Sequence, residues 1–248
     1  MTQLAVPLDR GAGAPVVLLH AEGVDASIWA EVAAALPGRV AAPDLRGHGR
    51  SDVVDPPYAM GALVGDVERM MEARGLTGAV IVGLSLGGMI AQALAVKRLD
   101  LVRGIILINS AAKIGTRVGW EDHAQAVARG GMAAVADDLA AKWAPRGGDP
   151  APIAKRLLDC APNGYRGVCA AMAGTDLLAA TATLRLPALA LAGREAQAVP
   201  PDLVCETAAL IPGSEFALIP RAGHLAPLDA ARDTAAYITT FLERTGHA

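Results

Sequence analysis

Aromatic residues are scarce in this chain of 248 residues: they make up 3% of it, whereas hydrophobic residues as a whole make up 53%. The core must therefore be built mainly from alanine, valine, leucine and isoleucine. An excess of charge of one sign is also lacking, since the formal net charge is −3. A chain with this balance offers no basic surface to nucleic acid or to anionic lipid, and we expect neither as a partner.

Long apolar runs are absent too. No run approaches the roughly 18 residues that a membrane span requires, and the segment 1–4 lacks the basic and apolar regions of a signal peptide. We therefore expect a cytoplasmic protein. The three cysteines, Cys160, Cys169 and Cys205, form neither a C-x-x-C pair nor a disulfide framework, which predicts buried structural thiols. No His, Cys and carboxylate cluster has the spacing of a metal site, so no metal is expected.

Short apolar runs alternate with helix-forming segments, which predicts an α/β fold with a mostly parallel sheet and helices on both faces. The predicted strands are 16–19, 40–43, 79–82, 105–108, 188–191 and 216–219. The predicted helices are 28–36, 60–74, 89–96, 201–210 and 228–243.

The alternation stops between residues 113 and 184, where the chain looks helical throughout. This predicts one core domain, 1–112 together with 185–248, interrupted by a helical cap. A cap in that place would cover the carboxyl ends of the strands, where open α/β sheets bind ligands. It would then exclude water and select a substrate; the plainer alternative is a cap that serves stability alone.

The segment 83–87 reads Gly-Leu-Ser-Leu-Gly and follows a predicted buried strand. It fits G-x-S-x-G, the strand-turn-helix corner that exposes a nucleophilic serine, here Ser85. Small flanking residues are needed because the backbone turns sharply. The helix that follows would present free N–H groups and the positive end of its dipole to an anionic intermediate. The alternative is a glycine-rich turn whose serine is incidental.

A base for Ser85 is expected on the loop after the last strand, where His224 follows Gly223. The oxyanion hole needs two N–H donors; the predicted ones are the main-chain groups of Leu86 and Glu22. His20 ends a strand nearby and is expected to orient the Glu22 loop. His48 lies in a glycine-rich turn, where hydrogen bonding to the backbone is the simpler role. His123 is expected to be a polar cap position and His247 a tail residue.

These motifs together resemble the α/β-hydrolase superfamily. Three further segments resemble 3-oxoadipate enol-lactonases: Leu-Ile-Asn-Ser-Ala-Ala-Lys-Ile-Gly-Thr at 107–116, Gly-Gly-Met-Ala-Ala at 130–134 and Gly-Tyr-Arg-Gly-Val-Cys-Ala-Ala at 164–171. The similarity extends from about residue 15 to residue 243 and includes the cap. It implies an α/β-hydrolase fold and hydrolysis of the enol-lactone of the β-ketoadipate pathway, without metal or organic cofactor.

One departure concerns the catalytic acid. The resemblance implies an aspartate where this chain has Ala196, and Glu195 lies one residue earlier. An acid normally fixes the histidine tautomer and stabilises the imidazolium. Three interpretations stay open: Glu195 substitutes for the aspartate, a weakened Ser85–His224 dyad operates, or hydrolysis has been lost. No acid follows the strand 105–108, where Asn109 stands.

The lactone that the resemblance implies carries a carboxylate, so we expect an anionic small-molecule substrate and a basic group facing the pocket from the cap. Lys113, Arg117 and Arg129 are the predicted cations, and Trp120 and Trp143 the predicted apolar wall. Three function classes follow: a serine hydrolase of a small lactone or ester, a hydrolase-fold enzyme with non-hydrolytic chemistry, or a ligand-binding protein with a decayed site. The sequence makes no prediction of oligomeric state.

Overall fold

The computed structural model describes residues 2–247. Its sheet has seven strands in the order β1-β3-β2-β4-β5-β6-β7. The strands are β1 (Leu8–Arg10), β2 (Pro15–Leu19), β3 (Arg39–Ala42), β4 (Ala79–Leu84), β5 (Val102–Ile108), β6 (Ala188–Gly193) and β7 (Glu215–Ile219). All neighbouring pairs are parallel except β1 with β3. The predicted parallel sheet is thus confirmed, and the antiparallel edge strand β1 was not predicted.

The helices follow the predicted alternation. They are α1 (Ala30–Ala35), α2 (Met60–Ala73), α3 (Leu86–Lys97), α4 (Arg117–Gly130), α5 (Ala136–Trp143), α6 (Ala151–Leu158), α7 (Pro162–Ala173), α8 (Leu178–Thr181), α9 (Pro201–Ala209), α10 (Ala226–Asp229) and α11 (Ala231–Arg244). Two 3₁₀ turns, η1 (Ala26–Trp29) and η2 (Met132–Ala134), precede α1 and α5. The single helix expected over 228–243 is two helices, α10 and α11.

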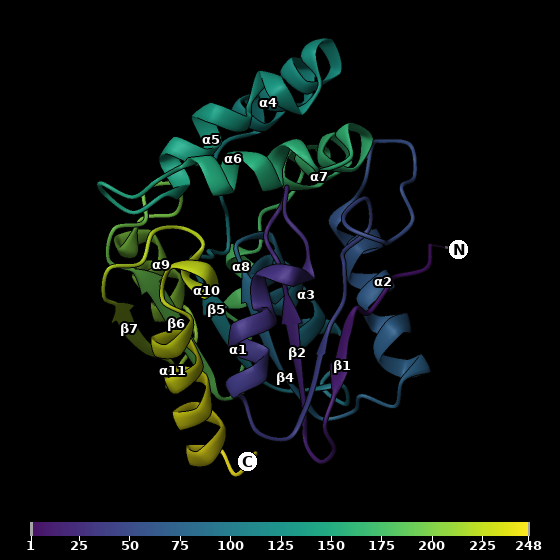
Figure 1. Cartoon of the computed structure of the whole chain (residues 1–248). Helices are drawn as coiled ribbons and strands as arrows, with labels where there is room; N and C mark the ends of the chain where they lie inside the picture. The colour runs from purple at the N-terminus through teal and green to yellow at the C-terminus, as the bar shows by residue number, and fades with distance from the viewer. Residues whose placement is uncertain (1, 248) are drawn as a thin grey trace.

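The two faces of the sheet are covered by different helices, as the alternation of side chains along each strand requires. Val16 and Leu18 of β2 pack with buried residues of α1 and α11. Val17 and Leu19 point to the opposite face, among buried residues of α2, α3 and α9 (Figure 1). Successive residues of one strand therefore contribute to two apolar layers, which accounts for the near-continuous apolar runs in the sequence.

Helices α4 to α7 form a layer of their own at one end of the sheet (Figure 1). Within this layer α4 packs mainly against α7, and α5 against α6. Between β5 and β6 the described chain contains no strand, in keeping with the predicted helical segment. The short helix α8, near the end of the predicted cap segment, contacts α3 of the core, and Thr181 in it donates a hydrogen bond to Gln92 over 2.7 Å.

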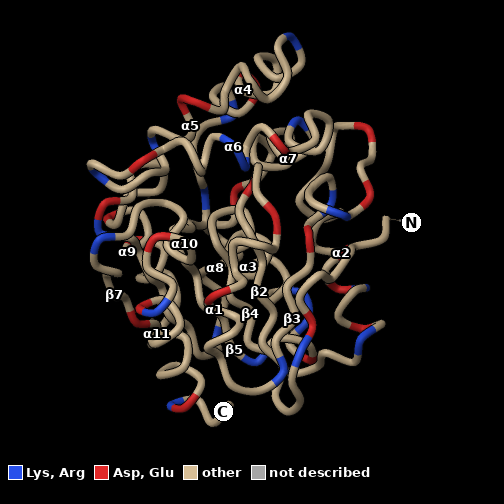
Figure 2. Tube along the Cα trace, viewed as in Figure 1, with Lys and Arg blue, Asp and Glu red and all other residues tan. Residues whose placement is uncertain are grey.

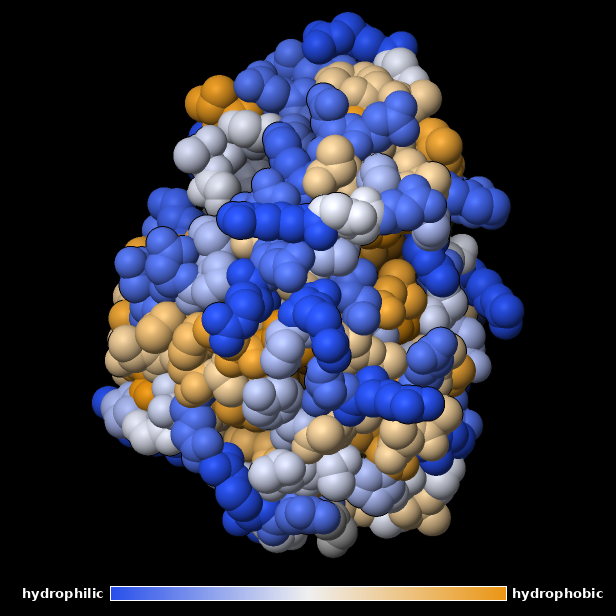
Figure 3. Space-filling view, turned by 60° about the vertical axis from the view of Figure 1, so that its left-hand side comes forward, coloured by the Kyte–Doolittle hydropathy of each residue, from blue (hydrophilic) through white to orange (hydrophobic). Residues whose placement is uncertain are grey.

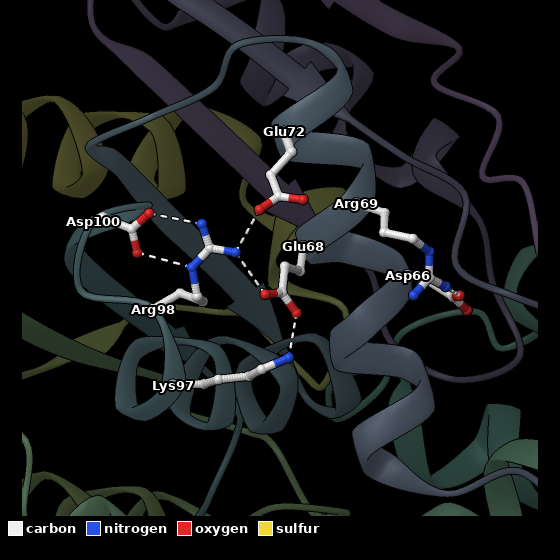
Figure 4. Close-up of polar contacts among 7 residues, drawn as sticks. All are labelled: Asp66, Glu68, Arg69, Glu72, Lys97, Arg98 and Asp100. Carbon is white, nitrogen blue, oxygen red and sulfur yellow. Dashed lines mark hydrogen bonds and ion pairs between the residues drawn. The ribbon is translucent and has the colours of Figure 1, made fainter.

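The elbow helix α3 is tied to α2 by a cluster of charges at its far end (Figure 4). Arg98 contacts Glu68 and Glu72, each at 2.6 Å, and Asp100 at 2.7 Å; Lys97 also pairs with Glu68. Single pairs of this kind at a surface contribute little stability. The guanidinium of Arg98 nevertheless connects the C-terminal end of α3 to α2. The N-cap at the other end of α3 is Ser85.

Charged residues of both signs are spread over the molecule, without a region of one sign alone (Figure 2). The face shown in space-filling representation is largely hydrophilic, with scattered apolar residues (Figure 3). None of the helices within residues 2–247 has the length and apolarity to cross a bilayer. All three thiols are free; Cys160 and Cys169 are buried, but Cys205 is exposed, so the prediction of a buried thiol is wrong for Cys205.

Candidate active site

Ser85 occupies the corner between β4 and α3. Its backbone lies at φ 51° and ψ −114°, a left-handed conformation that costs free energy in a residue with a Cβ. A Cβ on Gly83 would lie 2.3 Å from the carbonyl carbon of Gly87, and one on Gly87 would lie 2.3 Å from the carbonyl oxygen of Leu19. A side chain at either position would clash with the backbone, so both glycines are required at this corner, as the G-x-S-x-G pattern predicts.

Hydrogen bonds from the neighbouring strand hold the corner in place. The N–H of Ser85 donates to the carbonyl oxygen of Ile108 over 3.0 Å, and the hydroxyl of Ser110 donates to the carbonyl oxygen of Ser85 over 2.7 Å. The N–H groups of Gly88 and Met89 also bond to this carbonyl, as the first turn of α3. The strained conformation is thus fixed by β5 on one side and by the helix on the other.

The hydroxyl of Ser85 does not hydrogen-bond to His224. Its Oγ donates a hydrogen bond to Oε2 of Glu22 over 3.0 Å. Glu22 lies in the loop after β2, and burial raises the pKa of its carboxyl to about 7, against the opposing hydrogen bonds from its own N–H, from Ser85 and from the N–H of Leu86. The side chain of Glu22 is thus at the two main-chain groups predicted as the oxyanion hole, a contact that the sequence analysis did not anticipate.

Two buried histidines hold the Glu22 loop. Nδ1 of His20 lies 2.7 Å from the carbonyl oxygen of Ala21, and its Nε2 accepts from the N–H of Leu45 over 2.8 Å. Nε2 of His48 accepts from the N–H of Gly23 over 3.0 Å. Burial lowers the pKa of His20 to about 4 and that of His48 to about 3. Both rings are therefore neutral near pH 7, and the backbone role predicted for His48 is confirmed.

His224 lies in the loop after β7, as predicted. Its N–H donates to the carbonyl oxygen of Trp143 over 2.8 Å, and the two rings have their centroids 4.9 Å apart. Neither ring nitrogen has a hydrogen-bond partner among residues 2–247. Burial lowers the pKa of His224 to about 3, so the ring is neutral at pH 7 and both its nitrogens await a partner.

Asn109 anchors the His224 loop, a role that sequence reasoning missed. Its side-chain amide donates to the carbonyl oxygens of Gly223 and His224 over 3.0 and 2.7 Å. Its Oδ1 accepts from the N–H of Gly193 over 2.8 Å, and its backbone has a positive φ of 42°. The side chain of Asn109, directly after β5, therefore connects the end of β6 to the His224 loop. A polar residue directly after a buried strand was the available signal.

The structure does not bring Glu195 to His224. The Glu195 carboxylate accepts a hydrogen bond from the N–H of Arg146 over 2.8 Å, while its own N–H bonds to the carbonyl oxygen of Ala222. The side chains of these two adjacent loop residues point in different directions: that of Ala196 is buried, at 5% exposure, whereas Glu195 is half-buried. The contact between Glu195 and the imidazole, one of the three interpretations, is thus not formed, and within residues 2–247 no acid hydrogen-bonds to a ring nitrogen of His224.

A cavity of about 270 Å³ lies between the cap and the loops that follow the strands. From the core it is lined by Glu22, Val199 and His224, and from the cap by Trp120, His123, Leu139, Lys142 and Trp143, among others. The predicted apolar wall of Trp120 and Trp143 is therefore present. His123, whose Nδ1 lies 3.1 Å from the hydroxyl of Tyr165, lines the cavity as well and is more than a polar cap position.

The predicted cap cations lie elsewhere. Lys113 pairs with Asp176 at 3.0 Å and Arg117 with Glu121 at 3.7 Å, and Arg129 is exposed; none of the three lines the cavity. Lys142 lines it instead. The other three lysines of the chain are ion-paired, whereas Lys142 has no ion pair within residues 2–247. The cation of this cavity is thus one that the sequence analysis did not name.

Comparison with known proteins decides the family. A model of the "Alpha/beta hydrolase family" matches residues 16–237. The chain belongs to the alpha/beta hydrolase family. It is 31% identical over 199 residues to 3-oxoadipate enol-lactonase 1 of Acinetobacter baylyi, a match that covers 77% of this chain and 74% of that protein. The predicted fold and the resemblance are therefore confirmed.

Two solved structures align with almost the whole chain. A thermophilic esterase from Thermogutta terrifontis, with malate bound, has a TM-score of 0.93 and 30% identity, and the alignment covers 100% of this chain and 95% of that one. The enol-lactonase from Burkholderia xenovorans has a TM-score of 0.90 and 30% identity, with 98% and 96% covered. The chain is thus similar to both an esterase and an enol-lactonase.

Within the described residues, no group of three or more His, Cys, Asp or Glu side chains is placed to hold a metal ion. The polar groups that line the cavity include those of acid–base chemistry: the carboxyl of Glu22, the imidazole of His224 and the ammonium group of Lys142. The hydroxyl of Ser85 lies next to them, hydrogen-bonded to Glu22.

Proposed function

We propose that the protein is a serine hydrolase that cleaves a small lactone or ester bearing a negative charge, with 3-oxoadipate enol-lactone as the first candidate. The observation that carries the proposal is the backbone of Ser85, held at φ 51° in the strand-helix corner. Left-handed strain at a non-glycine residue persists where the surrounding structure imposes it, and such residues cluster at active sites. The similarity to an enol-lactonase and an esterase supports the reaction class.

In the proposed reaction the Oγ of Ser85 attacks the acyl carbon and forms an acyl-enzyme, which water then hydrolyses. The N–H groups of Leu86 and Glu22 stabilise the oxyanion. His224 acts as a base in this cycle, because burial keeps its ring neutral and its unprotonated ring nitrogen has no hydrogen-bond partner among residues 2–247. An enzyme whose catalytic histidine lacks an acid partner has a lower kcat, by up to roughly four orders of magnitude.

The negative charge of the substrate is inferred from Lys142. An anion moved from water into a cavity suffers a large loss of hydration unless a cation meets it. Lys142 lies in the last turn of α5 and lines the cavity, and its charge contributes, after burial, to lowering the pKa of His123. The esterase from T. terrifontis holds malate, which is also a carboxylate. A small carboxylate-bearing ester or lactone therefore suits this cavity.

The test compares hydrolysis of the enol-lactone with that of a neutral aryl ester by the wild-type protein and by Ser85→Ala. We expect the wild type to hydrolyse the lactone and Ser85→Ala to lose activity on both compounds. Turnover of the aryl ester alone would reject the lactone and keep the hydrolase. Unchanged activity of Ser85→Ala would reject Ser85 as the nucleophile.

A second candidate is proton transfer without hydrolysis, and one observation favours it. The cavity holds a carboxyl whose pKa burial raises to about 7, whereas Ala196 stands where hydrolases of this kind have their acid. Such a carboxyl exchanges protons readily near neutral pH. Incubation in heavy water distinguishes the two functions. Incorporation of deuterium into a ketone or keto acid, without cleavage of any ester, would favour proton transfer.

A further inference from the structure

The carboxyl of Glu22 lies between the proposed nucleophile and the cavity. Ser85 is completely buried and does not line the cavity. Glu22 accepts the hydrogen bond of its hydroxyl over 3.0 Å and lines the cavity, with 4% of its surface exposed. Among the described residues, no other acid lines this cavity. A substrate in the cavity therefore reaches Ser85 beside the Glu22 carboxyl.

The surroundings of Glu22 favour its neutral form. Burial raises the pKa of this carboxyl to about 7, and the groups that oppose the shift are hydrogen bonds rather than cations. A charge on Glu22 also contributes, after burial, to raising the pKa values of Tyr165 and Cys169 of α7. The other titratable groups near it are the two histidines that hold its loop and three groups that line the cavity: His20, His48, His123, Lys142 and His224.

A negative charge on Glu22 would oppose the reaction at Ser85. When Oγ bonds to the acyl carbon, the carbonyl oxygen becomes negative, within two bonds of Oγ. A Glu22 carboxylate at hydrogen-bonding distance from Oγ would repel that oxygen, and the repulsion is strong where water is excluded. The neutral carboxyl has the opposite effect, because it carries an O–H donor. An acid kept neutral by an apolar site can thus serve as an oxyanion donor.

We propose that Glu22 is a catalytic residue whose neutral carboxyl donates a hydrogen bond to the oxyanion that forms when Ser85 attacks. The inference rests on the proposed function, because it takes Ser85 as the nucleophile. It extends that function by adding a side-chain donor to the two main-chain donors of Leu86 and Glu22.

His224 stays the base of the reaction. The hydroxyl of Ser85 turns from Glu22 to His224, which takes its proton while Oγ bonds to the acyl carbon and the carbonyl electron pair moves to oxygen. When the intermediate collapses, the bond to the leaving oxygen breaks and that oxygen takes the proton from His224. Water hydrolyses the acyl-enzyme through the same histidine. The O–H bond of Glu22 stays intact throughout, so Glu22 stabilises charge and transfers no proton.

The first measurement is the pH dependence of kcat/KM for phenyl acetate, a neutral ester, between pH 5.5 and 8.5. For the wild type we expect a fall of about tenfold per pH unit above pH 7, as Glu22 loses its proton. Burial lowers the pKa of His224 to about 3, so the base is neutral over the whole range and adds no inflection.

The second measurement compares two substitutions of Glu22. Glu22→Leu is similar in size and has no donor, so at pH 6 its kcat should be about 100-fold below that of the wild type, with KM little changed. Glu22→Gln keeps an N–H donor and cannot ionise. It should exceed Glu22→Leu in kcat by at least about tenfold at pH 6, and its kcat/KM should not fall above pH 7. At pH 8.5 it should therefore be more active than the wild type, a gain that damage to the fold cannot produce.

Glu206→Gln is the matched control, since Glu206 is an exposed glutamate on α9; it should keep the wild-type profile. A wild-type kcat/KM that is constant or rises through pH 7 would overturn the inference without any variant. A kcat of Glu22→Leu within about twofold of wild type at pH 6 would overturn it as well, and so would a fall above pH 7 that persists in Glu22→Gln. Ser85→Ala separates the two proposals: activity that survives it would reject the nucleophile and the role of Glu22 together, whereas the other outcomes concern Glu22 alone.

Discussion

Ser85 and Glu22 lie 63 positions apart in the chain, yet the hydroxyl of one donates to the carboxylate of the other over 3.0 Å. The contact exists because β2 and β4 are parallel neighbours, with Leu19 opposite Gly83. Parallel neighbours end at the same edge of the sheet, so the loop after β2 and the corner after β4 meet there. The serine that we propose as the nucleophile is thus paired with a carboxyl group at a place where the family motif predicts only a backbone donor.

The missing partner of His224 leads to the first prediction. Ala196→Asp should raise ester turnover at least tenfold, because a carboxylate there would fix the imidazole tautomer and stabilise the imidazolium. The loop is suitably placed, since the N–H of the preceding residue, Glu195, bonds to the carbonyl oxygen of Ala222 beside the histidine loop. The measurement is kcat on a neutral aryl ester at saturation.

Ala196→Asn is the control for this prediction, because it matches aspartate in size and lacks its charge. It should leave kcat near that of the wild type. Equal kcat values for Ala196→Asp and the wild type would show that a charge at this position does not reach His224.

Short sequence patterns predicted much of the candidate site. The corner at Ser85, the loop position of His224 and the backbone role of His48 each depend on a few adjacent residues. The strands of the sheet interior were predicted because they are buried on both faces. Strand β1 was missed because it is short and mostly exposed, so it shows no apolar run.

The remaining site residues depend on packing between distant segments. Lys142 was not named because its position follows from how α5 lies over the cavity, and no local pattern separates it from a solvated lysine. One of the three interpretations had Glu195 turn toward His224, but the direction of a loop side chain is set by partners such as Arg146. The contact of Glu22 required the register of β2 and β4, which a single sequence does not reveal.

The second prediction concerns Lys142. Lys142→Ala should raise KM for an anionic lactone or ester by about 10- to 100-fold, the effect expected when a charged substrate loses its cation in a partly enclosed site. The constants for a neutral aryl ester should stay within about twofold. Steady-state kinetics on the two substrates give the comparison.

Lys155→Ala serves as the control for Lys142→Ala, because Lys155 is also on a cap helix but pairs with Asp159 at 3.2 Å. It should change neither KM. Parallel loss on both substrates in Lys142→Ala would indicate damage to the cap, and an unchanged KM for the anion would exclude Lys142 as its partner.

The third prediction concerns the backbone at the nucleophile corner. Gly87→Ala should lower the free energy of unfolding by about 2 kcal/mol or more and reduce activity, because its Cβ would meet the backbone of Leu19 at 2.3 Å and backbone atoms cannot move aside as a side-chain tip can. Gly61→Ala in α2 has no heavy atom within 4 Å of its new Cβ and should stabilise the helix by about 0.5–1 kcal/mol. Urea unfolding of both variants measures the contrast; similar stabilities would contradict it.

The last prediction uses the buried titratable groups. His20, His48 and His224 have their pKa values lowered by burial from 6.5 to about 4, 3 and 3. Below pH 6.5 the unfolded chain therefore binds protons that the folded chain does not, and each histidine lowers stability by about 1.4 kcal/mol per pH unit as the pH falls toward 4.

Glu22 acts in the opposite sense between pH 7 and 4.5, because burial raises its pKa from 4.5 to about 7 and the folded state holds the extra proton. Glu22→Gln removes this opposing contribution. Its free energy of unfolding relative to wild type should thus rise by about 3 kcal/mol from pH 4.5 to 7, as measured by urea unfolding at each pH. Glu206→Gln, on the exposed side of α9, should follow the wild type, and a Glu22→Gln difference that does not vary with pH would show that the carboxyl is not buried as an acid of raised pKa.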